Sequence, residues 1–583
     1  MCHPNPAPPQ HPEHPAPWWQ QGGAIYHIYP RSFADSNGDG FGDLRGITEK
    51  LDHLAWLGVE ALWMGPVFRS PQVDNGYDIS DYRDIDPLFG TLADMDELIA
   101  AAHRRGIRVL LDLVLNHSST EHRWFAASRD DPHGPYGDFY HWQDPAPGGG
   151  PPNNWWSFFS IPAWTWCAER GQYYLNLFAP EQADLNWTNR EVRREMAEIA
   201  NFWLDRQVDG FRMDVINLIS KSPGYPSIPD GGTPRGYFID GPDALRWIQE
   251  FRRSLRDPDA TLLVGETPGT TPESLRSWTA REHRALDMVI SFEHVQVDHS
   301  HGSRWNPVPF APQDLAQILA EQQQALSGSS WPSLYAGNHD QPRVVSRFGD
   351  DQRFRRDSAI ACAALFTLLR GTPIVYQGDE IAMANFPLES PEELQDVESR
   401  NAYQALLEAG VPPEEAFARV RVQARDNART PMQWTSGPAG GFSEAGGGTG
   451  APWFPVNPDY REWNVAAQRA AAEAREPSVL GAYRDLLALR RQHQPLTSGS
   501  CTFPGLADLA EQDSPVIVFQ RGGSGVGEHT MTIVINFSSS PAPVPDAAGL
   551  VLPRSRRDAV FATHRDATDA TLHPWEVMVV SVT

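Results

Sequence analysis

Eight short apolar, strand-like runs recur along the chain between Ala24 and the stretch TPIVYQGDE, and no other feature restricts the fold as strongly. Helix-like segments separate them, near 44–57, 95–103, 190–205, 244–255, 272–283, 314–326 and 358–369. Repeated alternation of strand and helix predicts a parallel sheet with helices outside, and eight such units close into a TIM (β/α)8 barrel. We therefore predict an α/β barrel whose chemistry lies at the C-terminal ends of the strands.

Polar residues stand where several of these predicted strands end. Arg212 and Asp214 lie two positions apart in DGFRMDVIN, so they share one face of a strand. An aspartate beside a guanidinium stays ionised at neutral pH, as a carboxylate nucleophile requires. A structural Arg/Asp pair would fit this segment alone equally well. However, His117, Glu266 and Asp340 stand at the ends of other predicted strands. With Asp214 this makes three carboxylates at three strand ends, which indicates one active site at the mouth of the barrel.

The loop DSNGDGFGD, directly after the first predicted strand, has the ligand spacing of a cation site. Oxygen-bearing side chains at alternate positions, with Gly40 at the bend, match the opening of a calcium loop. The twelfth position is Gly46, not glutamate, so the loop is not an EF-hand. The alternative is a metal-free turn. We expect a structural Ca²⁺ or Mg²⁺ held by Asp35, Asn37, Asp39, the carbonyl of Phe41 and Asp43.

Two stretches interrupt the alternation and a third follows it. Residues 118–184 are rich in Trp, Pro and Gly and too long for an ordinary loop, which predicts an inserted subdomain B beside the site. Residues 385–465 are predicted to be an irregular insertion. From 496 to 583, short alternating runs predict a C-terminal antiparallel β-sandwich domain. The Pro-rich residues 1–22 are expected to be a disordered tail, and the barrel then comprises 23–117 and 185–495.

Composition excludes several classes of partner. The net charge of −26 argues against binding to nucleic acid and suits neutral ligands. The four cysteines have no CxxC spacing, so neither a zinc site nor a disulfide framework is expected.

The sequence shows no secretory signal, and no stretch is long and apolar enough to span a bilayer. We expect a cytoplasmic protein that is a monomer or a weak homo-oligomer.

Several motifs resemble the α-amylase family of glycoside hydrolases, and the resemblance extends from about Ala24 to the end of the chain. DLVLNHSS, GFRMDVIN, VGETPG and GNHDQPR are similar to the four conserved regions of that family and stand in the same order. QADLNW resembles a signature of the oligo-1,6-glucosidase group, with Ala183 where the group usually has proline. RDNARTPMQW and GTPIVYQGDE are also similar to segments of that group.

The resemblance implies roles for individual residues. It makes Asp214 the nucleophile, Glu266 the general acid/base and Asp340 the carboxylate that braces the distorted sugar. The family also places a calcium or magnesium ion in the DSNGDGFGD loop and uses no organic cofactor. The residues that the resemblance assigns to the pocket for the terminal glucose are Asp74, Tyr77, His117, Phe178, Arg212, His339 and Arg429, with Arg425 as the alternative to the last.

The same resemblance bears on the substrate. Val215 resembles the residue associated with cleavage of α-1,6 bonds, and FEHVQVDHS lacks the charged motif of similar sucrose isomerases. We expect a retaining, exo-acting α-glucosidase that releases glucose from short oligosaccharides, preferably α-1,6-linked. The alternatives are an α-1,4-glucosidase, a trehalose-6-phosphate hydrolase and a glucosyl-transferring sucrose isomerase. A non-enzymatic partner of a transporter would lack part of the carboxylate triad, which this chain keeps.

Overall fold

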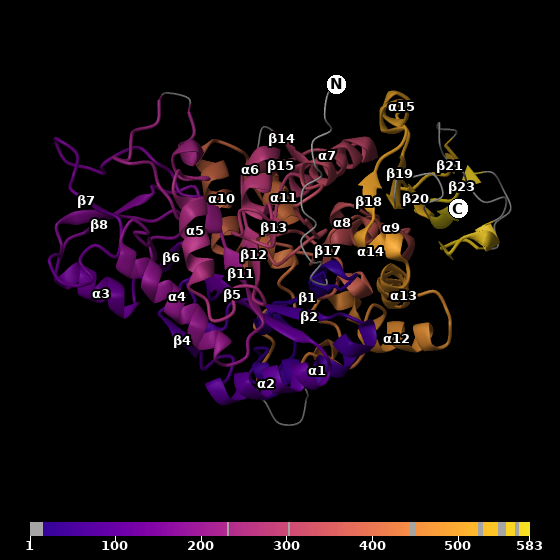
Figure 1. Cartoon of the computed structure of the whole chain (residues 1–583), viewed down its shortest axis with the longest axis horizontal. Helices are drawn as coiled ribbons and strands as arrows, with labels where there is room; N and C mark the ends of the chain where they lie inside the picture. Colours follow the sequence, from indigo (N-terminus) through magenta and orange to yellow (C-terminus); the bar gives the residue numbers. More distant parts are fainter. Residues whose placement is uncertain are drawn as a thin grey trace, which may run out of the picture.

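The structure is a computed structural model that describes residues 16–229, 232–300, 303–443, 450–522, 529–545, 556–565 and 571–582. A central barrel carries an inserted subdomain on one side (left in Figure 1) and a C-terminal sheet domain on the other (right).

Eight parallel strands form the barrel, which confirms the predicted fold class. Ladder hydrogen bonds link them continuously from β16 through β17 and β1 round to β13. Side chains join the remaining seam, because Ser333 Oγ donates to the Val289 carbonyl and Tyr335 OH to the Ser291 carbonyl, both at 2.6 Å. The strands are β1 (Ile25–Ile28), β2 (Ala61–Met64), β5 (Arg108–Val114), β11 (Gly210–Asp214), β12 (Leu262–Glu266), β13 (Met288–Ile290), β16 (Ser333–Leu334) and β17 (Thr372–Tyr376).

Helices cover the outside of the barrel, close to the predicted positions. The first shows the local causes: the Asp43 side chain accepts from the N–H of Gly46 and caps its start, and Gly58, at φ +91°, ends it. Leu51 and Leu54 lie on its buried face. The helices are α1 (Leu44–Leu57), α2 (Leu92–Arg104), α4 (Arg190–Leu204), α5 (Ala244–Arg253), α6 (Pro272–Thr279), α7 (Pro312–Ala325), α9 (Arg355–Leu368) and α13 (Val479–Gln492).

Large apolar side chains fill the barrel interior. Trp63, Leu110 and Ile374 belong to one buried cluster there. Trp19, in the 3₁₀ turn η1 (Trp18–Gln20), joins this cluster, and its carbonyl accepts from Thr372 Oγ1 at 2.6 Å. The expectation of a disordered tail is therefore wrong for residues 16–22, because the indole packs into the barrel core. Residues 1–15 lie outside the described part of the chain.

The inserted subdomain follows β5 and lies beside the barrel mouth. Its elements are β6 (His117–Ser119), α3 (Arg123–Asp130), β7 (Trp142–Gln143), β8 (Trp164–Cys167), β9 (Gln172–Leu175) and β10 (Gln182–Asp184). β10 pairs with β6, so the subdomain ends where it began. Lys221 ties this point to the barrel, because its Nζ contacts Asp184 Oδ2 at 2.7 Å, Asn116 Oδ1 at 2.8 Å and the Leu218 carbonyl at 2.7 Å. All three ammonium hydrogens thus have acceptors.

The insertion before α13 is more regular than predicted. α10 (Val397–Glu408) and α11 (Pro413–Gln423) pack together in the upper half of Figure 1, so the expectation of irregular structure is wrong for these residues. Their buried side chains are few and mostly small or polar, as Ser399, Ala402 and Ala416 show, so the sequence has weak helical periodicity here.

The C-terminal domain is a five-stranded antiparallel sheet in the order β18 (Ser500–Thr502), β19 (Val516–Gly522), β20 (Thr530–Asn536), β24 (Val577–Val582) and β22 (Phe561–Ala562). Ile517 and Phe519 on one face join the main core of the molecule. Among the described residues, the other face packs against β21 (Ala542–Pro543), β23 (Thr571–Leu572) and Leu509 of α15 (Leu506–Glu511). The second layer of the predicted sandwich is therefore a two-stranded sheet, because the barrel covers the first face.

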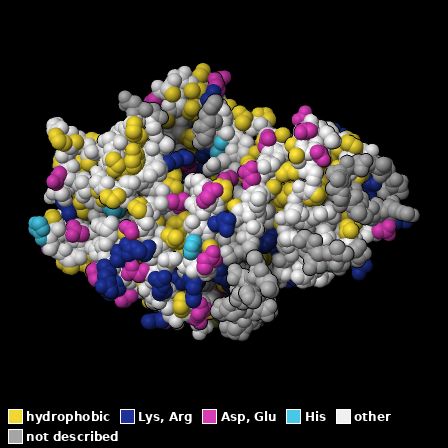
Figure 2. Space-filling model, turned by 45° about the horizontal axis from the view of Figure 1, so that its top comes forward, with side chains coloured by type: hydrophobic (Ala, Val, Ile, Leu, Met, Phe, Trp, Pro, Cys, Tyr) yellow, Lys and Arg dark blue, Asp and Glu magenta, His cyan; other side chains and the backbone are white. Residues whose placement is uncertain are grey.

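Charges of both signs are interspersed over the face in Figure 2, with basic side chains gathered at its lower left. A groove along α4 and α5 is rich in arginine, but several of these arginines bind neighbouring carboxylates. Arg194 contacts Glu191, Glu195 and Glu198, and Arg256 contacts Asp205. Such pairs are typical of solvated helix faces.

Candidate active site

Arg212 joins carboxylates from three adjacent strands at the barrel mouth. Its Nη1 contacts Asp112 Oδ1 at 2.8 Å and Asp214 Oδ1 at 2.7 Å, and its Nη2 contacts Glu266 Oε2 at 2.7 Å. Asp214 and Glu266 end β11 and β12, which are hydrogen-bonded neighbours. The two predicted catalytic carboxyl groups therefore face each other across one guanidinium.

Asp112, in the middle of β5, is a residue that the sequence analysis missed. It is 1 % exposed and accepts from Arg212, from Tyr77 OH at 3.1 Å and from Trp63 Nε1 at 3.3 Å. The available signal was a single acid inside the otherwise apolar run RVLLDLV. An acid at an inward strand position needs buried donors, and the barrel supplies three.

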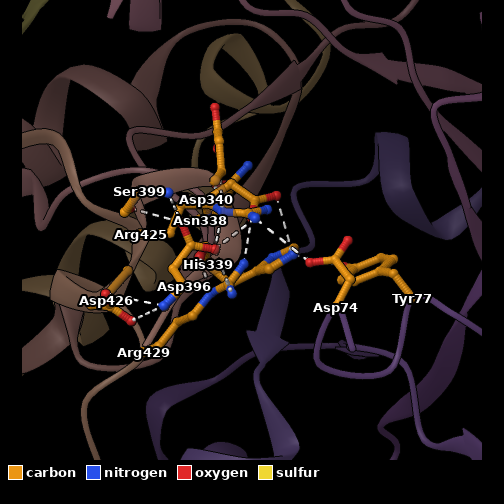
Figure 3. Close-up of polar contacts among 12 residues, drawn as sticks. Asp74, Tyr77, Asn338, His339, Asp340, Asp396, Ser399, Arg425, Asp426 and Arg429 are labelled. Carbon is orange, nitrogen blue, oxygen red and sulfur yellow. Dashed lines mark hydrogen bonds and ion pairs between the residues drawn. The ribbon is translucent and has the colours of Figure 1, made fainter. Parts of the chain in front are cut away.

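His339 and Asp340, which follow β16, also belong to the site (Figure 3). His339 Nε2 contacts Tyr77 OH at 2.7 Å and Asp340 Oδ2 at 3.2 Å. Asp340 Oδ1 receives Arg429 Nη2 at 2.8 Å and Arg425 Nη1 at 3.1 Å. Two arginines therefore hold one carboxylate.

Asp396, at the start of α10, binds these arginines from behind (Figure 3). Its Oδ1 receives Arg425 Nη2 at 2.6 Å and Arg429 Nη1 at 3.5 Å, while Oδ2 accepts from Ser399 Oγ at 2.7 Å. The helical insertion thus supplies part of the wall of the site, which strand-end reasoning does not reveal.

Asp74, His117 and Phe178 lie together on the side of the inserted subdomain. Gln182, on β10, connects two of them, because its Nε2 donates to Asp74 Oδ2 at 3.1 Å and contacts His117 Nε2 at 3.2 Å. The Phe178 ring lies 5.1 Å from the His117 ring. From the sequence, Gln182 was noted only as part of the QADLNW motif, and no role in the pocket was predicted for it. The pairing of β10 with β6 places it there.

These residues surround a pocket of about 360 Å³, a volume near the lower end of the range for small-molecule sites. The predicted residues that line it are Asp74, Tyr77, His117, Phe178, Asp214, Glu266 and Asp340. Arg212, His339 and Arg429 lie behind this lining and contact it. Of the two arginines considered for this position, Arg425 lines the pocket directly, whereas Arg429 lies behind it, and both bind Asp340.

Further lining residues come from several segments. Phe158 belongs to the inserted subdomain, Val215 follows Asp214, and Phe292, His299 and Trp305 come from the region after β13. β14 (His299–Ser300) and β15 (Ser303–Pro307) hold the last two. Of these residues, only Val215 and those in the segment FEHVQVDHS were singled out from the sequence.

Burial and neighbouring charges shift the pKa values of the ionisable groups of the site in different directions. Burial raises the pKa of Glu266. The positive charge of Arg212 lowers it in part, and the negative charge of Asp340 raises it further. Burial also raises the pKa of Asp74, to about 7. For Asp340, burial is outweighed by His339 and by the neighbouring arginines, which hold its pKa below the ordinary range. Burial lowers the pKa values of His117 and His339 to about 3, so both imidazoles are neutral at pH 7.

The predicted cation loop is a tight turn before α1. Asp35 Oδ1 accepts from the N–H of Gly38 at 2.6 Å, and Asp43 Oδ1 from that of Gly46 at 2.7 Å. Asn37 Nδ2 donates to Asp39 Oδ2 at 3.0 Å. Across the described residues, no three His, Cys, Asp or Glu side chains are grouped to hold a metal. The loop's carboxylate, amide and peptide oxygens are nevertheless the donor types that Ca²⁺ takes.

A (β/α)8 barrel with three carboxylates from three strand ends around a small pocket defines the class of glycoside hydrolases that use paired carboxyl groups. The family profile "Alpha amylase, catalytic domain" matches residues 27–499, and the chain belongs to this family.

Relatives are similar over nearly the whole chain. An oligo-1,6-glucosidase of Parageobacillus thermoglucosidasius is 42% identical over 97% of this chain and 99% of its own. A trehalose-6-phosphate hydrolase of Bacillus subtilis is 39% identical over 97% and 98%. Among solved structures, the trehalulose synthase of Pseudomonas mesoacidophila matches with a TM-score of 0.89 at 35% identity, over 98% of this chain and 100% of that one. No helix of the described residues is long and apolar enough to cross a membrane.

Proposed function

We propose that this glycoside hydrolase is a retaining, exo-acting α-glucosidase that releases glucose from short oligosaccharides and prefers α-1,6 bonds. The observation that carries the proposal is the guanidinium of Arg212, which holds Asp214 and Glu266 on adjacent strands at the floor of one small pocket. Retaining hydrolysis requires two carboxyl groups about 5 Å apart on opposite sides of the scissile bond.

In the proposed reaction, Asp214 attacks the anomeric carbon while Glu266 gives a proton to the departing glycosidic oxygen. Water then attacks the glucosyl–Asp214 ester, and Glu266 takes a proton from it. Burial and the repulsion between these two carboxyl groups favour one shared proton near neutrality, and in this scheme it resides on Glu266. Asp340, kept ionised by its arginines, braces the positive charge that develops on the sugar.

The opposite wall suits the terminal glucose. Asp74 and Arg425 present hydrogen-bonding groups to the pocket, and neutral His117 has both donor and acceptor capacity for sugar hydroxyls. Tyr77 and Phe178 offer aromatic faces. In this proposal Arg212, His339 and Arg429 orient the lining groups from behind.

The charges of the pocket support a neutral leaving group. Of its three lining arginines, Arg425 is bound by Asp340 and Asp396, and Arg304 is bound by Glu398. Only Arg235, exposed at the rim, has no ion pair among the described residues. A phosphorylated sugar would need more free positive charge, which makes trehalose-6-phosphate hydrolysis the second candidate. Val215 and the oligo-1,6-glucosidase relatives support the α-1,6 preference.

The test is the ratio of kcat/KM for glucose release from isomaltose and from maltose, which compares transition-state binding at the leaving-group side. A preference for isomaltose supports the proposal. A preference for maltose would be consistent with an α-glucosidase but would reject the α-1,6 preference. Failure on both substrates, with turnover of trehalose 6-phosphate or sucrose, would establish one of the alternatives.

We also propose that the loop formed by Asp35, Asn37, Asp39, Phe41 and Asp43 binds a structural Ca²⁺ or Mg²⁺. Its hard oxygen donors and its place ahead of α1, away from the pocket lining, support this role. We also propose a cytoplasmic location, which cell fractionation tests, and a monomeric or weakly oligomeric state, which size-exclusion chromatography tests.

A further inference from the structure

Two hydrogen-bond donors meet on one oxygen of Glu266. Arg212 Nη2 lies 2.7 Å from Oε2, and the peptide N–H of Val215 donates to the same atom at 3.2 Å. No described residue donates to Oε1, although Glu266 lines the pocket and its carboxyl group is almost fully buried. The two oxygens of this carboxyl group are therefore not equivalent.

Val215 adopts an unusual backbone conformation to place that N–H. Its φ of 36° and ψ of 43° are in the left-handed region, which a β-branched side chain rarely occupies. Strained residues of this kind persist only where the surrounding structure holds them. Here the turn follows Asp214 directly, so the chain leaves β11 and at once points a peptide N–H at β12.

The inserted subdomain helps to hold the strained turn. The Val215 side chain is 8% exposed and belongs to a cluster with Leu218 and with Trp155 and Leu177 of the subdomain. The N–H of Leu218 donates to the Val215 carbonyl at 3.0 Å, which fixes the turn from the other end. Packing on one side and a hydrogen bond on the other thus oppose relaxation of the backbone.

We propose that Val215 is a positioning residue whose peptide N–H, together with Arg212, occupies Oε2 of Glu266 and leaves Oε1 to carry and deliver the acid proton. This inference rests on the proposed role of Glu266. In the first step the Oε1–H bond breaks and its proton passes to the glycosidic oxygen as the bond to the anomeric carbon breaks. In the second step Oε1 accepts a proton from the attacking water, and the two donors on Oε2 stabilise the carboxylate between the steps.

The direct test removes the N–H without changing the side chain. Replacing the peptide before Val215 by an ester, through incorporation of the matching hydroxy acid, deletes the donor. The carboxylate of Glu266 then loses a hydrogen bond, so its pKa rises and the basic limb of the kcat/KM profile moves up by about 0.5 to 1 pH unit. The same replacement before Ile216, whose N–H donates to no described residue, is the control and should not move it. An unmoved limb for Val215 would overturn the proposal.

A pair of ordinary variants tests the backbone conformation independently of the ester. Glycine occupies the left-handed region freely and keeps the N–H, whereas alanine keeps part of the strain. V215G should therefore have a Tm at or above that of V215A, although it removes more apolar surface, and its basic limb should remain in place. A clearly higher Tm for V215A, or a shift of the limb in V215G as large as that of the ester, would contradict the assignment.

Glu266→Ala separates this inference from the proposed function. If Glu266 is the acid/base, E266A loses turnover, and azide restores it with a nitrophenyl glucoside, whose leaving group needs no proton. Undiminished activity of E266A would disprove the role of Glu266 and the inference with it. The expected result for E266A with an unshifted Val215 ester would disprove only the inference.

Discussion

Arg212 is the residue on which the site depends, because it binds Asp112, Asp214 and Glu266 from a fully buried position. Asp112 does not line the pocket, but it binds the same guanidinium nitrogen, Nη1, as the pocket-lining Asp214. Tyr77, which Asp112 also binds, does line the pocket. Asp112 is thus a positioning residue for groups on both sides of the mouth.

Asp112→Asn should therefore damage both stability and turnover. Breaking a buried ion pair costs about 3–5 kcal/mol, and the two remaining carboxylates on Arg212 place the expected loss near 3 kcal/mol. A guanidinium displaced by about 1 Å would lower kcat about 10²-fold. Denaturant unfolding and isomaltose kinetics measure the two effects. Asp84→Asn breaks an exposed pair with Arg69 and is the matched control, with an effect below about 1 kcal/mol.

His122 gives a pH dependence that is separate from catalysis. Burial lowers its pKa to about 3 in the folded protein, against about 6.5 when unfolded. Between these values only the unfolded state binds the proton, so this contribution to stability is complete above pH 6.5 and is lost as the pH falls towards 3.

His122→Asn removes this titration and keeps an acceptor for the N–H of Trp124 at the start of α3. We expect the wild type to lose about 2–3 kcal/mol more than the variant between pH 7 and pH 4.5. Thermal or urea unfolding at both pH values measures the difference. His133→Asn, at an exposed position, should behave like the wild type, and equal pH dependence in all three proteins would contradict the argument.

Among the elements, the short β10–β6 pair determines how the inserted subdomain meets the barrel. Gln182 and Asp184 both lie on β10, the first facing Asp74 and His117 and the second binding Lys221. One short strand therefore orients pocket residues and anchors the subdomain.

Lys221→Met should loosen this connection. Asp184 would become a buried carboxylate without its cation, at a cost of about 3–5 kcal/mol. We expect faster limited proteolysis within residues 118–184 and weaker substrate binding. Lys50→Met is a matched control, because among the described residues Lys50 has no ion pair and lies over the Trp434 ring at 5.2 Å, an interaction of about 0.5–1 kcal/mol. Equal protease resistance of K221M and wild type would show that other contacts suffice.

The cation loop belongs to the same scale, because a bound ion would stabilise the turn that leads into α1. A ligand present at about 100 times its Kd stabilises a folded protein by about 2.7 kcal/mol. Chelation by EDTA should lower Tm, added Ca²⁺ should restore it, and Asp39→Ala should abolish the response while kcat at low temperature changes little. A Tm that is indifferent to EDTA and Ca²⁺ would mean that the loop is a metal-free turn.

At the scale of the whole molecule, the buried Arg521 of β19 joins the C-terminal domain to the barrel, beside Arg490 of the barrel helix α13. α9 ends beneath the sheet, and Arg521 Nη1 donates to its Leu368 carbonyl at 2.7 Å while Arg490 Nη1 donates to the Thr367 carbonyl at 2.8 Å. The free carbonyls of a helix end favour cationic donors. Since one face of the sheet lies in the main core, barrel and sheet are expected to unfold together.

Arg521→Met tests this coupling, because methionine fills space but leaves the Gly499, Ser500 and Leu368 carbonyls without their donor. Only the bond to the Leu368 carbonyl is fully buried, so at about 1–3 kcal/mol for a buried unsatisfied group we expect a loss of about 1–3 kcal/mol and a lower, still single, calorimetric transition. Arg565→Met, at an exposed position, should stay within about 0.5 kcal/mol. A normal Tm for R521M would mean that apolar packing alone holds the domain.

The sequence by itself determined the barrel, its eight strand positions and the strand ends that carry Arg212, Asp214, Glu266 and Asp340. Period and strand order are local properties, and a parallel barrel must bring its C-terminal strand ends together. The residues that strand-end reasoning could not reach are those whose place depends on packing between distant segments.

Tertiary structure alone decided the rest. It brought Asp112 under Arg212, carried α10 to the mouth with Asp396, and chose Arg425 over Arg429 for the pocket wall. It also placed Val215 in a left-handed turn. In each case a buried polar or strained group is held by a partner far away in the chain. No local pattern of residues predicts which partner that is.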